Sequence, residues 1–132
     1  MDATGFGYPK GQIPRMDIFS FEADGKLREL AQKVCREVNP EIGVHQGRIA
    51  SGDQFISDNG VKDAIISEFA GYAVEMEGAA IGQAAYLNKI PFLIIRAISD
   101  KADGSAVVDY PSFEKAAIEH SVKLTLGMMK EL

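Results

Sequence analysis

The sequence predicts an α/β fold with a mainly parallel sheet. Helical and strand-like patterns alternate along its 132 residues, and such alternation is typical of right-handed crossovers between parallel strands. One strand-like run, residues 91–98, is continuously apolar and β-branched, as in strands buried on both faces of a parallel sheet. The length suits one ordinary domain, and no linker or repeat divides it. We therefore expect a single domain over residues 1–132.

Four segments carry helical patterns: Glu22–Val38, Val61–Phe69, Glu77–Leu87 and Ser112–Leu132. In the first, the apolar residues recur with helical spacing and form one face, which consists of Leu27, Leu30, Ala31 and Val34. Asn39-Pro40 should end that helix. The third is rich in glycine and alanine, which suits close packing on a sheet. The last has an apolar face that consists of Phe113, Ala117, Leu124 and Met128.

Three segments are predicted as strands: Gly43–Ser51, Tyr72–Met76 and Pro91–Ile98. Residues 1–17, rich in glycine and proline, should form an irregular loop with no helix or strand. Three strands make a narrow sheet, and strands this apolar would need neighbours that the chain does not supply. His45 is placed in the first strand and His120 in the last helix, each isolated from other metal-binding residues.

Composition excludes several classes of function. The formal charge of -5, from 14 basic and 19 acidic residues, argues against a nucleic-acid surface, which needs clustered positive charge. The single cysteine, Cys35, allows no intrachain disulfide and is expected as a buried thiol in a helix. A chain with one cysteine and no intrachain disulfide fits a reducing, cytoplasmic location. We expect no signal peptide, no membrane association, no metal and no cofactor, because the sequence carries none of their patterns.

Acidic residues follow the predicted strands: Asp53, Glu75, Glu77 and Asp100. In an open α/β sheet, ligands bind just outside the carboxyl ends of the strands, and carboxylates there suit a polar, protonatable ligand better than a phosphate. The alternative is that such acids cap helix N-termini. For Asp53 we favour the helix cap. For Glu77 and Asp100, position alone leaves both interpretations open.

Three motifs, in order along the chain, resemble those of a known family. They are Ser51-Gly52-Asp53-Gln54-Phe55-Ile56, Val74-Glu75-Met76-Glu77-Gly78-Ala79-Ala80 and Arg96-Ala97-Ile98-Ser99-Asp100. With the opening segments 2–8 and 11–14, they resemble the purine-nucleosidase branch of the nucleoside phosphorylase superfamily, and within it the bacterial 5′-methylthioadenosine/S-adenosylhomocysteine nucleosidases. The resemblance implies a three-layer α/β/α fold with a mixed, mainly parallel central sheet, of which this chain corresponds to the C-terminal half.

The resemblance implies hydrolysis of the bond between adenine N9 and ribose C1′, in methionine salvage and recycling of S-adenosylmethionine by-products. Asp100 would be the catalytic acid at adenine N7, which requires a raised pKa, and Ser99 would orient it. Glu77 would bind the ribose hydroxyls, and its charge would stabilise an oxocarbenium-like transition state. The full set of implied substrate-binding residues is Phe55, which stacks on adenine, Ile56, which bonds the base edge through its backbone, Glu75, Met76, which packs on the sugar, Glu77, and Phe113 near the pocket mouth.

The resemblance also implies partners. Residues matching Phe6 and Pro14 line the neighbouring subunit's pocket in the family, which implies a homodimer with a small adenine nucleoside as substrate. The glutamate that activates the attacking water belongs to the family's N-terminal half, which we expect to be absent from these 132 residues. Two alternatives therefore stay open: a purine nucleoside phosphorylase, or a non-catalytic remnant that binds nucleosides or only dimerises.

Overall fold

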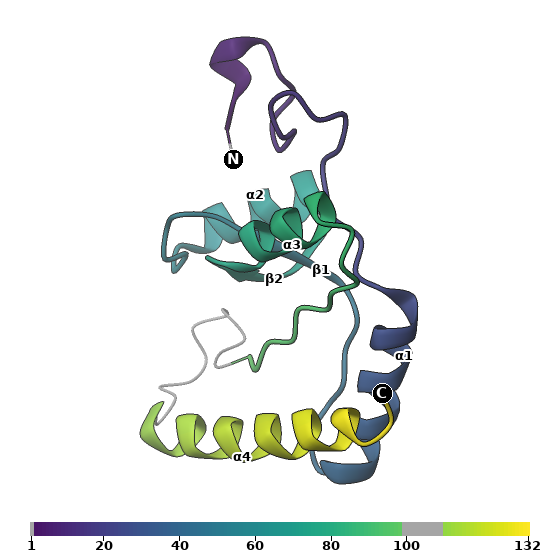
Figure 1. Cartoon of the computed structure of the whole chain (residues 1–132). Coiled ribbons are helices and arrows are strands. Elements are labelled where there is room, and N and C mark those ends of the chain that lie inside the picture. The colour runs from purple at the N-terminus through teal and green to yellow at the C-terminus, as the bar shows by residue number, and fades with distance from the viewer. Residues whose placement is uncertain (1, 99–109) are drawn as a thin grey trace.

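The structure is a computed structural model and describes residues 2–98 and 110–132. Its elements are the 3-10 turn η1 (Thr4–Phe6), α1 (Gly25–Val38), β1 (Arg48–Ser51), α2 (Asn59–Phe69), β2 (Gly71–Glu75), α3 (Gly78–Leu87) and α4 (Tyr110–Met129). Helices α2 and α3 lie on one side of the two strands, and α4 lies on the other (Figure 1). The predicted α/β class is confirmed.

Helix α1 has the apolar face that its sequence predicts. It begins after Asp24, whose side chain accepts a hydrogen bond of 2.9 Å from the backbone N–H of Leu27 and so satisfies one of the unpaired amides of the first turn. It ends at Asn39, as expected. Val34 and Cys35 are buried, so the predicted buried thiol is confirmed.

The buried core lies between α1 and α4. Val34 and Cys35 of α1 pack with Leu124 and Met128 of α4, and Leu30, Ala31, Val38, Val44 and Leu93 surround this cluster. Two polar contacts join the same helices. Lys33 Nζ lies 2.6 Å from Glu131 Oε2, and the Asn39 side-chain amide donates to the backbone carbonyl of His120 over 3.1 Å.

The sheet consists of β1 and β2, which run parallel with Ala50 opposite Val74 and Ser51 opposite Glu75. The predicted first strand was too long, because residues 43–47, including His45, are not in a strand. The pairing begins at Arg48, opposite Gly71. Ala70, just before β2, is the C-cap of α2 with φ +51°, so the chain turns there and offers no strand residue opposite 43–47.

The third predicted strand, Pro91–Ile98, is also wrong: this segment is extended but not paired in the sheet. Its start is bonded elsewhere, because the backbone carbonyl of Phe92 accepts the N–H of Asp24 over 2.9 Å. The segment runs from the end of α3 past the strands towards α4 (Figure 1). Leu93 of this segment packs against the α1–α4 cluster, whereas Ile95 and Ile98 are exposed, so the apolar composition of the segment does not by itself show a strand partner.

Two smaller expectations are corrected. Residues 1–17 contain the short turn η1, whereas the sequence predicted no helical structure there. Asp58 and not Asp53 caps α2, because the Asp58 side chain accepts from the N–H of Val61 over 2.9 Å. Asp53 lies exposed in the loop after β1.

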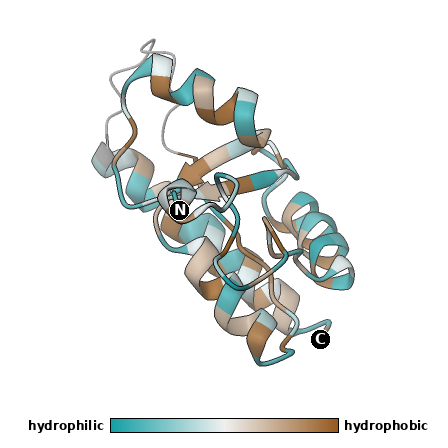
Figure 2. Cartoon of the chain, turned by 90° about the horizontal axis from the view of Figure 1, so that it is seen from above, coloured by the Kyte–Doolittle hydropathy of each residue, from teal (hydrophilic) through white to brown (hydrophobic). Residues whose placement is uncertain are grey.

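Apolar side chains also reach the surface. Figure 2 shows hydrophobic residues interspersed with hydrophilic ones along the helices. Several of the exposed ones lie after α3 and along α4: Ile95, Ile98, Ile118, Val122 and Leu126. Within residues 2–98 and 110–132, no helix has both the length and the apolar character that a bilayer crossing needs.

We predict that Gly127→Ala destabilises the chain. A Cβ at Gly127 would overlap Val34 Cγ1, and Val34 is a rigid, β-branched side chain that cannot swing aside. The clash should cost about 1–3 kcal/mol, more than the ~1 kcal/mol that alanine gains over glycine in a helix. The free energy of unfolding, from urea titration, checks this.

Two further variants control this prediction. Gly25→Ala in α1 should be neutral or stabilising, since a Cβ there meets only the far end of Arg28. In a Val34→Ala background, where the overlapping methyl is gone, Gly127→Ala should become stabilising. Equal effects of Gly127→Ala in both backgrounds would show that the two residues do not compete for the same space.

Candidate functional site

The carboxyl ends of the two strands lie side by side and carry the candidate site. Ser51 ends β1 opposite Glu75, which ends β2, and the N–H of Gly52 donates to the carbonyl of Glu75 over 3.1 Å. The chain leaves β1 into the loop that contains Phe55, and leaves β2 through Met76 into α3. This is the edge at which the sequence predicted a ligand.

Glu75 is a nearly buried carboxylate with a side chain only 9% exposed. Its Oε1 accepts a hydrogen bond from the Ser51 hydroxyl. Its Oε2 accepts the backbone N–H groups of Glu77, at 3.0 Å, and Gly78, at 2.7 Å, and pairs with Arg96. Both carboxylate oxygens are therefore engaged by the protein, as a buried charge requires.

These contacts set the charge of Glu75. Burial acts to raise the pKa of its carboxyl, but the hydrogen bonds from Ser51, the two backbone amides and Arg96 outweigh it, so the pKa lies below its usual value. Glu75 is thus ionised at neutral pH. It serves as a fixed anion and not as a proton donor.

Glu77 is more open, with 58% of its side chain exposed, and its Oε2 lies 2.7 Å from Arg96 Nη2. It occupies the N-cap position of α3, yet its side chain makes no capping hydrogen bond. The interpretation that the Glu77 side chain caps a helix N-terminus is therefore wrong. Burial acts to lower the pKa of Arg96, but Glu77 and Glu75 outweigh it and raise that pKa, so the guanidinium is a permanent cation between two carboxylates.

Apolar residues follow the carboxyl ends of both strands. Phe55 is 83% exposed in the loop after β1, and Met76 between the two glutamates is half exposed. Ile56, next to Phe55, is partly buried. An exposed aromatic ring after one strand and an exposed acid after its neighbour suit a ligand with a flat base and a hydroxylated sugar.

The structure gathers only part of the predicted site. Phe113 lies on α4, partly buried, and α4 is separated from β2 by the segment that follows α3 (Figure 1). Phe6 and Pro14 lie in the N-terminal segment, which projects beyond α2 and α3 (Figure 1). Ser99 and Asp100 lie outside the described residues. Of the described residues, no group of three His, Cys, Asp or Glu side chains converges as a metal site.

Ser51 and Arg96, the side-chain partners of Glu75, were given no role from the sequence, although both stand in the quoted motifs. Ser51 could have been found from its position as the last residue of a strand parallel to the one that ends at Glu75. Arg96 could have been found as the one charge in an apolar run, because a cation there requires an anionic partner.

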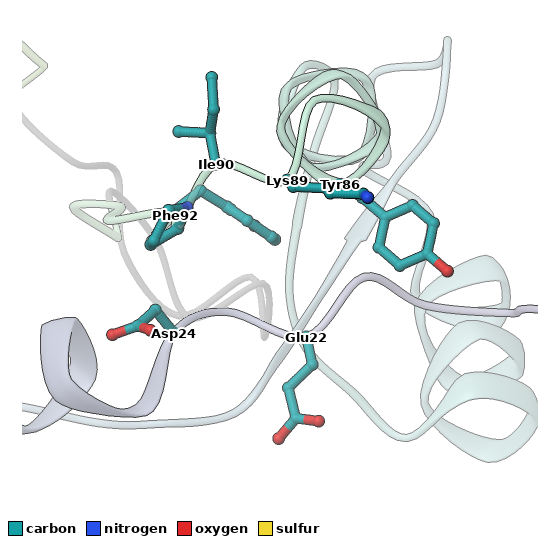
Figure 3. Close-up of a pocket in the computed structure, with 7 residues that line it drawn as sticks. Glu22, Asp24, Tyr86, Lys89, Ile90 and Phe92 are labelled. Carbon is teal, nitrogen blue, oxygen red and sulfur yellow. The ribbon is translucent and has the colours of Figure 1, made fainter.

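A shallow pocket lies away from this edge, beyond the C-terminal end of α3 (Figure 3). Glu22, Asp24, Tyr86, Lys89, Ile90, Pro91 and Phe92 line it. The side chain of Asp24 already accepts a hydrogen bond as the N-cap of α1. The side chain of Glu22 extends into solvent, with its Oε1 4.0 Å from Arg28 Nη2. The pocket contains none of the residues predicted for the site, and the carboxylate cluster remains the better candidate.

Comparison with known proteins agrees with this geometry. The family described as the phosphorylase superfamily matches residues 1–130. A 5′-methylthioadenosine/S-adenosylhomocysteine nucleosidase of Maridesulfovibrio salexigens is 47% identical over 99% of this chain and 57% of its own length. One from Exiguobacterium is 40% identical over 100% of this chain and 56% of its own.

A crystal structure gives the same result for the fold. The Campylobacter jejuni 5′-methylthioadenosine/S-adenosylhomocysteine nucleosidase superposes with a TM-score of 0.89 at 39% identity, covering 99% of this chain and 56% of that one. The chain thus spans a little over half the length of these relatives. The nucleoside phosphorylase-like fold implied by the motifs is confirmed, and the chain belongs to the phosphorylase superfamily.

Proposed function

We propose that this chain carries the nucleoside-binding and leaving-group side of an N-ribosyl hydrolase that acts on 5′-methylthioadenosine or S-adenosylhomocysteine. The observation that carries the proposal is the pair of glutamates at the end of β2, both paired with Arg96. The loop after the neighbouring strand β1 adds the exposed ring of Phe55. Relatives at 40–47% identity that are named as these nucleosidases support it.

In the proposed mechanism the bond between adenine N9 and ribose C1′ breaks, and its electron pair goes to the purine. Asp100, oriented by Ser99, supplies the proton at N7 that makes the leaving adenine neutral. Water adds to C1′ and loses a proton. We assign no residue of this chain to the activation of that water.

The remaining residues bind the substrate. Glu77 accepts from the ribose hydroxyls, and its negative charge, kept in place by Arg96, stabilises positive charge at C1′ in the transition state. Phe55 stacks on adenine, the backbone of Ile56 bonds the base edge and Met76 packs on the sugar. Glu75 contributes through its fixed negative charge, and Phe113 helps to close the pocket.

The proposal extends to assembly and setting. We assign Phe6 and Pro14 to the pocket of a second copy in a homodimer, where they would surround the 5′ substituent. Phe6 is 87% exposed, as a residue that inserts into another subunit would be in a lone chain. The corresponding setting is cytoplasmic methionine salvage, with recycling of S-adenosylmethionine by-products.

The choice between hydrolase and phosphorylase is tested by the cosubstrate. We expect a complete enzyme that contains this chain to release adenine and free methylthioribose from 5′-methylthioadenosine at the same rate with and without inorganic phosphate, as measured by chromatography of both products. Formation of a sugar 1-phosphate would instead support a purine nucleoside phosphorylase. Nucleoside binding without turnover in the 132-residue chain would support the non-catalytic alternative for this chain.

Asp100→Asn tests the proton donor. Because asparagine cannot deliver a proton, we expect turnover by a complete enzyme that contains this chain to fall by roughly 100-fold or more, while its affinity for the nucleoside, measured by calorimetry, is largely unchanged. Asp63→Asn, on the exposed surface of α2, is the matched control and should leave both quantities unaltered. An equal loss of binding and turnover in Asp100→Asn would argue against its role as an acid.

Phe55→Ala tests the stacking platform. Loss of one aromatic–base contact should weaken nucleoside binding by about 1–3 kcal/mol, while an exposed ring contributes little to the free energy of unfolding. Phe19→Ala, also exposed but in the segment before α1, is the control. Calorimetric titration with 5′-methylthioadenosine and urea unfolding separate the two effects, and equal weakening by both variants would contradict the assignment of Phe55.

A further inference from the structure

The N-terminus of α3 is capped from outside the helix. Helices leave their first backbone N–H groups without intrahelical partners, and the N-cap side chain commonly accepts one of them. In α3 the N-cap residue, Glu77, does not do so. Its own N–H and that of Gly78 donate to Glu75 Oε2, and the N–H of Ala79 donates to Ser51 Oγ over 2.7 Å.

Ser51 is central to this arrangement because its hydroxyl is used in both directions. A backbone amide can only donate and an ionised carboxylate can only accept. The oxygen of Ser51 therefore accepts from Ala79, and its hydrogen is committed to Glu75 Oε1. Ser51 lies in β1, Glu75 in β2 and Ala79 in α3. The two hydrogen bonds of the Ser51 hydroxyl therefore join these three elements at one point.

The contacts hold the turn that carries the exposed acid. Glu75 and Gly78 are both fixed, with the Glu75 carboxylate so close that a Cβ on Gly78 would lie 3.0 Å from Oε1. Met76 and Glu77 lie between these two anchors. Because other groups cap the helix, the Glu77 carboxylate is free to extend outward, where it meets Arg96 and remains 58% exposed.

We propose that Ser51 is a positioning residue, whose hydroxyl clamps Glu75 and the first turn of α3 so that Glu77 is presented to the ribose of a nucleoside. This inference rests on the function proposed above. The lowered pKa of Glu75, to which the Ser51 hydrogen bond contributes, is consistent with it.

The test compares Ser51→Ala, which removes the hydroxyl, with Ser51→Thr, which keeps it. Ser67→Ala, on an exposed position of α2, is the matched control. Three quantities are measured on the 132-residue chain: the pKa of Glu75 by carboxyl NMR titration, hydrogen exchange of the Ala79 amide, and affinity for 5′-methylthioadenosine by calorimetry.

In Ser51→Ala we expect the pKa of Glu75 to rise, because one donor to the carboxylate is lost. Exchange of the Ala79 amide should be at least about tenfold faster, and affinity for the nucleoside should fall about tenfold, as when one hydrogen bond to a charged group is removed. Ser51→Thr should restore all three values, and Ser67→Ala should change none. Exchange of the Val34 amide in the α1–α4 core reports whether the fold is intact, and Ser51→Cys, of similar size but a weak hydrogen-bonding group, replaces Ser51→Ala if it is not.

The outcomes separate the two proposals. If the unaltered chain binds the nucleoside and Ser51→Ala binds it equally well, the positioning role of Ser51 is overturned and the proposed function stands. If the affinity of Ser51→Ala falls while the pKa of Glu75 and the exchange of the Ala79 amide are unchanged, the positioning role of Ser51 is also overturned. If the unaltered chain binds no nucleoside, the proposed function fails, and the positioning role fails with it.

Discussion

One nearly buried carboxylate organises the carboxyl edge of the sheet. A charge removed from water is costly unless it is paired and hydrogen-bonded, and Glu75 obtains its partners from three different segments. Ser51 comes from β1, two backbone amides come from the start of α3, and Arg96 comes from the segment after α3. Each segment must keep its place for the charge to remain compensated, so the geometry of the edge follows from this single ion.

The α1–α4 core supports the same edge from a distance. Leu93 packs against the buried cluster of the two helices, and the carbonyl of Phe92 is bonded to the N–H of Asp24 just before α1. These contacts fix the start of the segment that carries Arg96, a few residues further along the chain. The apolar core, which contains no site residue, therefore helps to position the segment that carries the guanidinium.

Local signals in the sequence located the helices well. The apolar period and the helix-ending Asn39-Pro40 are encoded in neighbouring residues, and α1, α2 and α3 begin within three residues of their predicted starts. The strands were predicted less well. An apolar run such as 91–98 is typical of a buried strand, but a strand also needs a hydrogen-bonding partner, and that partner is remote in sequence. The same limit applies to Asp53, because a helix cap depends on where the helix begins.

By itself, the sequence determined the helices, the α/β class and the motifs that place this chain in its superfamily, since each is encoded in consecutive residues. It also singled out Phe55, Glu75 and Glu77. Only the tertiary structure decided that Ser51 and Arg96, 24 and 21 residues from Glu75, converge on its carboxylate, and that 91–98 is not a strand. The physical reason is that these contacts depend on the path of the whole chain, which brings remote hydrogen-bonding groups together.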